Sequence, residues 1–305
     1  MKKLLFISSL VVCSSLWAQE VTDNVEEVTV IGSRSEARSP QDTFSPVDVI
    51  SGSEFQNNGD TDFNNLMRNL VPSFSVNDQP ISDAASVMRP ANLRGMSPDH
   101  TLVLVNGKRR HRGSVLTWLG AYISDGAQGP DVSAIPASAL KSVEVLRDGA
   151  SAQYGSDAIA GVINFNLNDS ADGGFIEYRK GQYTEGDGDQ SYVMGNFGKP
   201  FGDGFVNVSY EFGNQQSTVR AVQRDDAAAL IADGYQGVPD PAMPWGRPFV
   251  KDDLKTFINF RTSYMSGEIY GHANYNSKTV DGTFYYRNPT NRGAVYSNDG
   301  GATML

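Results

Sequence analysis

The sequence predicts a small mixed α+β domain followed by about five antiparallel strands of a transmembrane β-barrel that these residues do not close. Three observations support this fold class. The N-terminus has the form of a secretory signal. Short helix and strand patterns fill residues 46–168. From Gly173 onward, apolar and polar residues alternate with a period of two, in segments of about ten residues.

The N-terminal segment reads as a signal peptide covering residues 1–18. Lys2 and Lys3 precede an apolar run that ends at Leu16, and Ala18 offers a cleavage point. The chain's single cysteine, Cys13, lies inside this segment, so the mature chain has no cysteine for disulfides or thiolate metal sites. The protein is therefore expected to be exported.

Composition excludes two classes of protein. The chain has 25 basic and 35 acidic residues, a net charge of −10, which disfavours nucleic-acid binding. No stretch after residue 16 approaches the ~20 apolar residues of a membrane-spanning helix, so a polytopic helical membrane protein is excluded.

A polar leader at residues 19–45 contains one β-prone segment. Its residues are Val25, Glu26, Glu27, Val28, Thr29, Val30 and Ile31. An isolated strand does not fold alone. The segment therefore either joins the sheet of the next domain or pairs with the sheet edge of a partner protein.

The domain at 46–168 mixes strands with a helix. Phe63, Leu66, Met67 and Leu70 share one helical face in a segment that begins at Asp62. The predicted strands cover residues 46–50, 101–105, 142–146 and 161–167, and a tight turn at 106–107 follows the second of them.

Five strands are predicted in the region 169–305. In the clearest, Val206, Val208, Tyr210 and Phe212 share one face, opposite Asn207, Ser209 and Glu211. The strands cover 174–183, 189–198, 204–215, 254–265 and 267–284. Short turns on one side and a long connection on the other are typical of outer-membrane β-barrels, although a soluble β-sandwich also alternates.

Several motifs together resemble the TonB-dependent outer-membrane receptor family. Residues 25–31 resemble its energy-coupling segment, the TonB box. Four further segments resemble its plug domain in order and spacing: 93–95 (LRG), 102–107 (LVLVNG), 142–149 (SVEVLRDG) and 153–164 (QYGSDAIAGVIN). The resemblance covers the leader and plug fully and the barrel only at its start.

This resemblance implies a 22-stranded barrel in the outer membrane, in contact with its lipids, with the plug in its lumen. A scarce ligand binds the extracellular side: an iron chelate, cobalamin, a saccharide or a peptide. The box then pairs with the periplasmic domain of TonB, which an inner-membrane complex energises, and the ligand is imported. For residues 25–31 the resemblance favours the extended handle over the internal strand.

The resemblance also implies roles for plug residues. Arg94 and Arg147 match arginines that face carboxylates of the barrel wall and latch the plug; alternatively, each caps a turn within the plug. Glu144 either pairs with Arg147 or lies against barrel backbone.

Two groups of residues are candidates for ligand contact. The basic run Lys108, Arg109, Arg110, His111 and Arg112 would attract an anionic ligand, or it is a solvated plug loop. Tyr235 and Trp245 would stack on a sugar or an aromatic chelator, or they stiffen a long loop.

No motif of an enzyme or a cofactor site is found. His100, His111 and His272 lack metal-ligand spacing, and no nucleophile elbow or phosphate-binding loop is present. The expectation is a receptor without catalytic residues, cofactor or metal.

Five strands leave two open edges, and unpaired backbone groups in hydrocarbon cost several kcal/mol each. We therefore expect these residues to be the N-terminal portion of a longer receptor. The alternative is a truncated, non-transporting product with at most a periplasmic plug-like ligand-binding domain.

Overall fold

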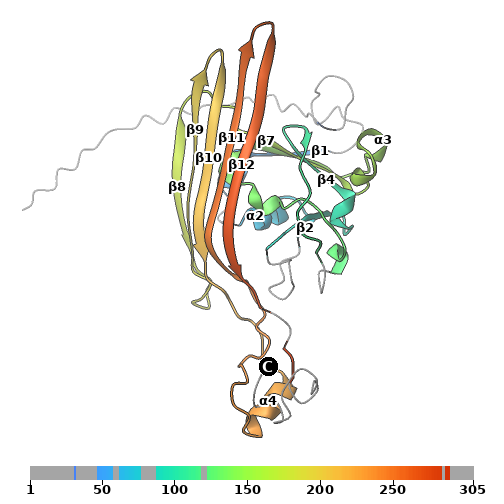
Figure 1. The fold of residues 1–305 in the computed structure, drawn as a ribbon, viewed down its shortest axis with the longest axis vertical. Helices are drawn as coiled ribbons and strands as arrows, with labels where there is room; N and C mark the ends of the chain where they lie inside the picture. The colour runs from blue at the N-terminus through green and yellow to red at the C-terminus, as the bar shows by residue number, and fades with distance from the viewer. Residues whose placement is uncertain are drawn as a thin grey trace, which may run out of the picture.

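The structure is a computed structural model, and it describes residues 31, 47–57, 62–76, 87–117, 122–283 and 286–288. The predicted signal peptide, most of the leader and residues 25–30 of the predicted box lie outside the described residues. The described chain forms a plug domain and a tall five-stranded sheet beside it, which we call the wall (Figure 1).

The plug is built on a mixed five-stranded sheet of order β1-β6-β7-β4-β5. Strand β4 runs parallel to β7, and the other pairs are antiparallel. The strands are β1 (Val47–Ser51), β4 (Thr101–Val105), β5 (Lys108–Arg109), β6 (Leu140–Leu146) and β7 (Gly161–Leu167). Four predicted strands are thus confirmed. A separate hairpin pair, β2 (Phe74–Val76) and β3 (Ala91–Leu93), was not predicted.

Short helices cover the plug sheet. The predicted helix is confirmed as α2 (Phe63–Leu70), and the Asp62 carboxylate caps it by accepting a 2.9 Å bond from the Asn64 amide. The others are α1 (Gly52–Asn57), α3 (Ser151–Tyr154) and the 3₁₀ turns η2 (Pro98–His100), η3 (Tyr122–Ser124), η4 (Val132–Ala134), η5 (Ala137–Ala139) and η6 (Ser156–Ala158).

Two hydrophobic clusters lie on opposite faces of the plug sheet. In the larger, Phe63, Leu66 and Met67 of α2 pack with sheet residues such as Val143 and Phe165. The smaller joins Ile31, Val47, Leu102, Leu104, Leu146, Ala158 and Val162. The wall contributes one buried residue, Phe257, to the larger cluster. The plug core is therefore supplied mainly by the plug itself.

The wall is a fully antiparallel sheet whose strands follow chain order. The strands are β8 (Gly174–Gly181), β9 (Gln190–Phe201), β10 (Gly204–Gln215), β11 (Phe249–Tyr264) and β12 (Gly267–Asp281). Four predicted strand ends differ from the structure by two residues or more. β8 ends at Gly181 rather than 183, and β9 ends at Phe201 rather than 198. β11 begins at Phe249 rather than 254, because a register shift between Lys251 and Leu254 breaks the alternation there. β12 ends at Asp281 rather than 284.

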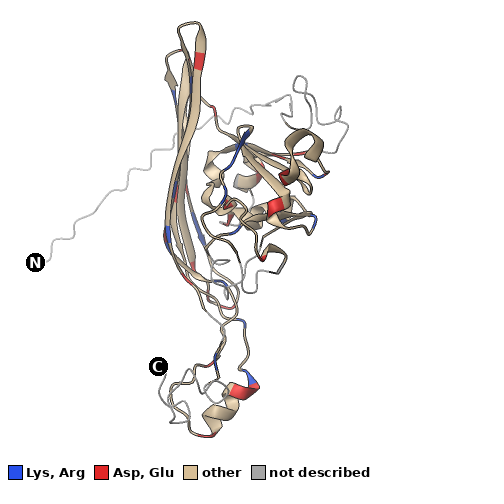
Figure 2. Cartoon of the chain, turned by 45° about the vertical axis from the view of Figure 1, so that its right-hand side comes forward, with Lys and Arg blue, Asp and Glu red and all other residues tan. Residues whose placement is uncertain are grey.

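The two faces of the wall differ as the alternation predicts. On β10, Val208 and Phe212 are 40% and 43% exposed on the outer face, whereas Ser209 and Glu211 are buried against the plug. Figure 2 shows few charged residues along the half of the wall that ends in the short turns. An apolar outer face and a polar inner face are typical of a membrane barrel.

The plug docks on the polar inner face of the wall. Turn η5 lies against β9 and β10, where the Ser138 hydroxyl donates to the Tyr210 carbonyl at 3.1 Å. Asn259 of β11 bonds to the plug twice: it accepts from the Asn106 side chain at 3.2 Å and donates to the Asn168 carbonyl at 2.9 Å. Residues 216–248, which include α4 (Asp225–Ala232), form a long loop beyond the wall, at the end opposite the short turns (Figure 1). Among the described helices, none is long and apolar enough to cross a membrane.

Candidate functional site

The candidate site is the charged contact between plug and wall, at the end of the wall that carries the 216–248 loop. Its central residue is Asp62, the cap of α2. One Asp62 oxygen lies 2.5 Å from Arg89 of the plug and 3.4 Å from Arg247, which lies two residues before β11. Burial alone would raise the pKa of Asp62, but the two guanidinium groups outweigh it and hold that pKa well below its usual range. The carboxylate is thus ionised and shared between plug and wall.

A second charged contact lies beside the first. Lys278 of β12 is 3.8 Å from an Asp131 oxygen and donates to the Ser133 hydroxyl at 3.0 Å. The same Asp131 carboxylate caps η4 by accepting from the Ser133 amide at 3.0 Å. Both charged side chains are only 13% exposed. Here too a plug carboxylate caps a plug element and meets a wall cation.

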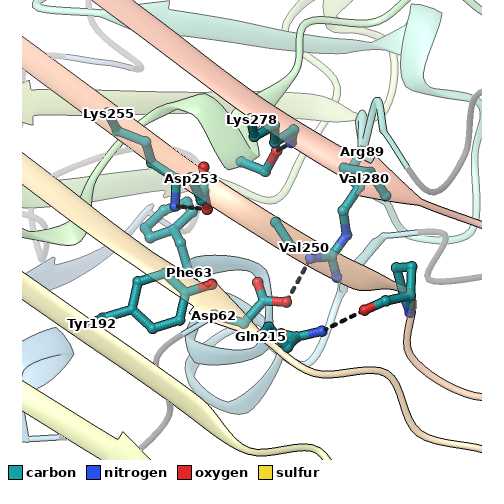
Figure 3. Close-up of a pocket in the computed structure, with 12 residues that line it drawn as sticks. Asp62, Phe63, Arg89, Tyr192, Gln215, Val250, Asp253, Lys255, Lys278 and Val280 are labelled. Atoms are coloured by element: carbon teal, nitrogen blue, oxygen red, sulfur yellow. Dashed lines mark hydrogen bonds and ion pairs between the residues drawn. The ribbon is translucent and has the colours of Figure 1, made fainter.

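The wall holds a buried charge cluster of its own next to these contacts. The Lys255 ammonium lies 2.5 Å from Glu211 and 3.3 Å from Asp253, and all three are almost fully buried. Lys255 and Asp253 lie beside Asp62 and Tyr192 (Figure 3), and these residues line a cavity of about 50 Å³. The cavity also touches Gln215, Pro248, Val250 and Val280, which all lie at the loop end of the wall. Its lining combines charged and apolar side chains, and it has room for a few water molecules.

The arginines predicted as the plug latch have partners within the plug. Arg147 pairs with Asp48 of β1 at 2.7 Å, and Arg94 donates to the Arg147 carbonyl at 3.3 Å. Arg94 also lies 3.8 Å from Asp148, with a left-handed backbone at φ 55°. Both arginine side chains are 42% exposed. Their predicted contact with wall carboxylates concerns strands beyond the five described and stays a prediction.

Glu144 lies inside the plug sheet. It is 1% exposed and accepts hydrogen bonds from Asn164 at 3.2 Å and from Asn166 at 3.0 Å, both on the neighbouring strand β7. The two amides place donors beside a buried carboxylate, and such pairing offsets much of the cost of burying its charge. The partners expected from the sequence were Arg147 and barrel backbone, and these asparagines were not predicted.

The basic run 108–112 divides between the wall and the plug. Lys108 lies over the Tyr270 ring at 5.8 Å, and Arg110 donates to Asn274 at 2.8 Å, with both partners on β12. Burial lowers the pKa of Arg110, and the carboxylate of Asp131 opposes this shift. Arg110 therefore belongs to the plug–wall contact.

The other members of the run face the plug or solvent. Arg109 pairs with Asp157 at 2.5 Å and donates to the Tyr154 carbonyl, and Arg112 lies 3.9 Å from Asp157. Burial, then the charge of Arg110, lowers the pKa of the exposed His111. The structure therefore does not gather the five residues into one basic surface.

Tyr235 and Trp245 both lie in the 216–248 loop. Tyr235 follows α4, and Trp245 is 40% exposed near the root of the loop. Beside that root, the Tyr183 ring has the guanidinium groups of Arg220 and Arg247 within 5.6 and 5.8 Å of its centroid. The loop region thus carries aromatic and cationic groups, but away from most of the basic run.

The end of the predicted TonB box is anchored in the plug. Ile31 is 1% exposed and packs in the smaller hydrophobic cluster with Leu102, Leu146 and Val162. Residues 25–30 lie outside the described residues, so whether they form an extended handle or an internal strand stays a prediction.

Sequence reasoning missed the residues that form the candidate site. Asp62 is recognisable as a helix cap because it precedes an amphipathic segment. Nothing in the sequence signals that Arg247, 185 residues later, meets the same carboxylate. Within the described residues, no group of three or more His, Cys, Asp or Glu side chains is arranged to hold a metal ion.

Comparisons with known proteins agree with the plug-and-wall fold. The family model "TonB-dependent Receptor Plug Domain" matches residues 39–162. The probable TonB-dependent siderophore receptor PirA of Acinetobacter baumannii is 29% identical over 188 residues, 60% of this chain and 24% of that protein. The vitamin B12 transporter BtuB of Vibrio vulnificus is 34% identical over 157 residues, 52% of this chain and 23% of that protein. The chain therefore spans about a quarter of the length of these relatives.

A solved structure of the ferric enterobactin receptor of Pseudomonas aeruginosa superimposes with a TM-score of 0.55. The match covers 77% of this chain and 33% of that one at 18% identity, and it therefore supports the fold alone. The relatives are named as receptors and transporters rather than enzymes.

Proposed function

The chain belongs to the TonB-dependent receptor family, and from this premise we propose that it is the N-terminal portion of an outer-membrane receptor for TonB-coupled import. One observation carries the proposal: a plug domain packs against the polar inner face of a wall whose outer face is apolar. Such a wall suits a lipid boundary on one side and a filled lumen on the other.

The wall dimensions support the placement in a bilayer. Strand β10 has 12 residues. At ~3.3 Å per residue and a tilt of ~45°, such a strand spans about 28 Å, close to the apolar band of a membrane barrel. In the proposed receptor, further strands pair with the edges β8 and β12 and close the barrel, because open edges are not tolerated in hydrocarbon.

Residues 25–31 are proposed to carry the coupling to TonB. A β-prone segment on a polar leader can add a strand to the sheet edge of the periplasmic domain of TonB, which transmits tension through main-chain hydrogen bonds. Export through the signal peptide at residues 1–18 is part of the same proposal.

Ligand contact is proposed at the loop end of the molecule. Tyr235 and Trp245 offer aromatic surfaces there, and Arg220 adds a guanidinium group. In the basic run, Lys108, Arg109, Arg110, His111 and Arg112 all stay candidates for ligand contact. Lys108 and Arg110 also contact the wall, and Arg109 and Arg112 contact Asp157 of the plug. The relatives named above suggest a siderophore or a cobalamin as the ligand class.

Arg94, Arg147 and Glu144 remain proposed parts of a plug latch. The two arginines lie near one end of β6, and 42% of each side chain is exposed, which leaves them accessible to carboxylates of further barrel strands. Glu144 supports this region from within the sheet.

Deletion of residues 25–31 in the receptor tests the proposal. We expect uptake of the ligand to be lost while ligand binding to whole cells is retained, because the segment is proposed to contact TonB and not the ligand. Loss of binding together with uptake would instead indicate that the segment is structural. Deletion of the same number of leader residues at 34–40 is the matched control and should leave both measurements unchanged.

A second candidate is a plug-like binding domain that does not transport. This candidate is favoured because the plug's own residues form its hydrophobic core, and the wall contributes only Phe257 to the larger cluster. Expression of residues 19–168 alone discriminates: cooperative unfolding with ligand affinity supports this candidate, and a disordered chain counts against it.

A further inference from the structure

Three wall-facing features do not belong to the predicted sites: the cavity, the Lys255 cluster and the two cross-interface ion pairs. The Lys255 cluster lies wholly within the wall, since Glu211 and Asp253 are both wall residues. The two ion pairs, in contrast, join separate domains. Each links a plug carboxylate to a wall cation: Asp62 to Arg247 and Asp131 to Lys278.

We propose that these two pairs form a plug latch at the loop end of the wall, with a polarity opposite to that of the predicted arginine latch. In the predicted latch, the plug supplies cations and the wall carboxylates. Here the plug supplies carboxylates and the wall cations. The two latches also lie at different places in the plug, since Asp62 and Asp131 adjoin α2 and η4 whereas Arg94 and Arg147 adjoin β3 and β6.

Burial indicates that these pairs hold the domains together. The side chains of the first pair are 11% and 13% exposed, and those of the second are 13% exposed each. Exposed ion pairs contribute little because water competes for both partners. A charge left without its partner in such a buried place is strongly destabilising. Separation of plug and wall at this end therefore requires water to enter and solvate Arg247, Lys278 and Asp131, while Asp62 keeps its contact with Arg89 of the plug.

The position of Arg247 gives this latch a role in gating. Arg247 is the penultimate residue of the 216–248 loop, and its guanidinium group lies 5.8 Å from the Tyr183 ring at the loop root. Movement of the loop therefore pulls directly on the cap of α2. This role rests on the proposed function, because it assumes that a ligand moves the loop.

The cations are better targets for mutation than the carboxylates. Asp62 and Asp131 each cap a plug element, so their replacement would disturb the plug itself. Arg247 and Lys278 lie in the wall region and cap no plug element. Arg224 is a matched control for Arg247, because it belongs to the same loop and pairs with Asp226 within that loop at 2.9 Å.

Hydrogen exchange of the receptor in membrane nanodiscs tests the latch, with neither ligand nor TonB present. In the Arg247→Met, Lys278→Met and double variants, amides of α2 and of residues 131–140 should exchange about tenfold faster or more, because each variant loses a charged contact across the interface. Amides of wall strand β10 should keep their wild-type rates. Arg247→Lys and Lys278→Arg should restore slow exchange in the plug, and Arg224→Met should leave it unchanged.

Two results would overturn the proposal: wild-type exchange in the plug of the double variant, or equal acceleration in plug and β10. The second would mean that the cations merely stabilise the wall. If Arg247→Met does not assemble, Lys278→Met decides the question by the same criteria. A failure of the proposed function is distinguishable, because it would appear as absent uptake in a receptor whose plug exchange still depends on both cations.

Discussion

Replacement of Ile31 by alanine should release the end of the proposed TonB box from the plug. Ile31 is 1% exposed and contacts a cluster that includes Leu102, Leu146 and Val162. The truncation removes three carbon atoms from a packed site, and comparable core substitutions cost about 2–5 kcal/mol. Because Ile31 precedes the rest of the plug in sequence, the expected effect is local undocking rather than unfolding of the sheet.

The extent of undocking can be worked out from the lower limit of this energy range. A loss of about 2 kcal/mol raises the population of the undocked segment by about 30-fold. If the segment must undock before TonB binds it, the apparent affinity for TonB rises in proportion to the undocked fraction, until that fraction approaches one. The periplasmic domain of TonB should therefore bind Ile31→Ala more tightly than the wild type in the absence of ligand.

Limited proteolysis of the leader and TonB-domain binding measure the two consequences. The protease should cleave Ile31→Ala about 30-fold faster near residue 31 when cleavage is slow relative to reclosing. Ile159→Ala is the control, since that side chain is 42% exposed on the same plug and should change neither measurement. Equal cleavage rates for Ile31→Ala and the wild type would refute the anchoring of the box by Ile31.

Three further predictions follow from the plug and the wall. The pKa of Asp62 is held below its usual range, so the ionised carboxylate contributes its full stability above the unfolded-state pKa of about 3.9, and this stability is lost as the pH falls from there through the folded-state pKa. The difference in melting temperature between wild type and Asp62→Asn should therefore shrink as the pH is lowered below about 4. A constant difference would contradict the ionised cap. Gly161 has φ 148°, and a Cβ there would lie 2.3 Å from the Leu146 carbonyl oxygen. At Gly95 a Cβ would meet nothing within 4 Å, so Gly95→Ala should cost only about 1 kcal/mol. Gly161→Ala should therefore lower the stability of the plug in urea by more than Gly95→Ala. Val208→Arg on the outer face of β10 should destabilise the membrane-inserted receptor by about 2–4 kcal/mol in reversible unfolding, and a neutral effect would mean that this face does not contact lipid.

Periodic patterns in the sequence were enough to predict most of the fold. The face that joins Val208 to Phe212 follows from alternation alone, and so does α2 from the spacing of its apolar residues. The start of β11 was predicted wrongly because the register shift near Asp252, which has φ 54°, interrupts the period that identifies a strand. The hairpin pair β2 and β3 was missed because three-residue strands are too short to show a period.

The candidate site was less accessible to sequence reasoning. Asp62 and Arg247 are 185 residues apart, and only the docking of the plug on the wall brings them together. The charged runs gave a misleading signal: Lys108 to Arg112 are adjacent in sequence, yet Arg109 faces Asp157 of the plug whereas Arg110 faces Asn274 of the wall. Local sequence indicates which residues are charged, but tertiary docking decides which opposite charge each one meets.

The proposed receptor imports its ligand at the expense of the proton gradient through TonB. The most direct measurement follows uptake of a panel of radiolabelled iron–siderophore complexes and cobalamin into cells that produce the receptor, with and without TonB and with and without an uncoupler. At least one ligand should accumulate only when TonB and the gradient are both present, while its binding at the cell surface should be unaffected. Accumulation that continues without TonB, or in the presence of the uncoupler, would contradict coupling of import to TonB.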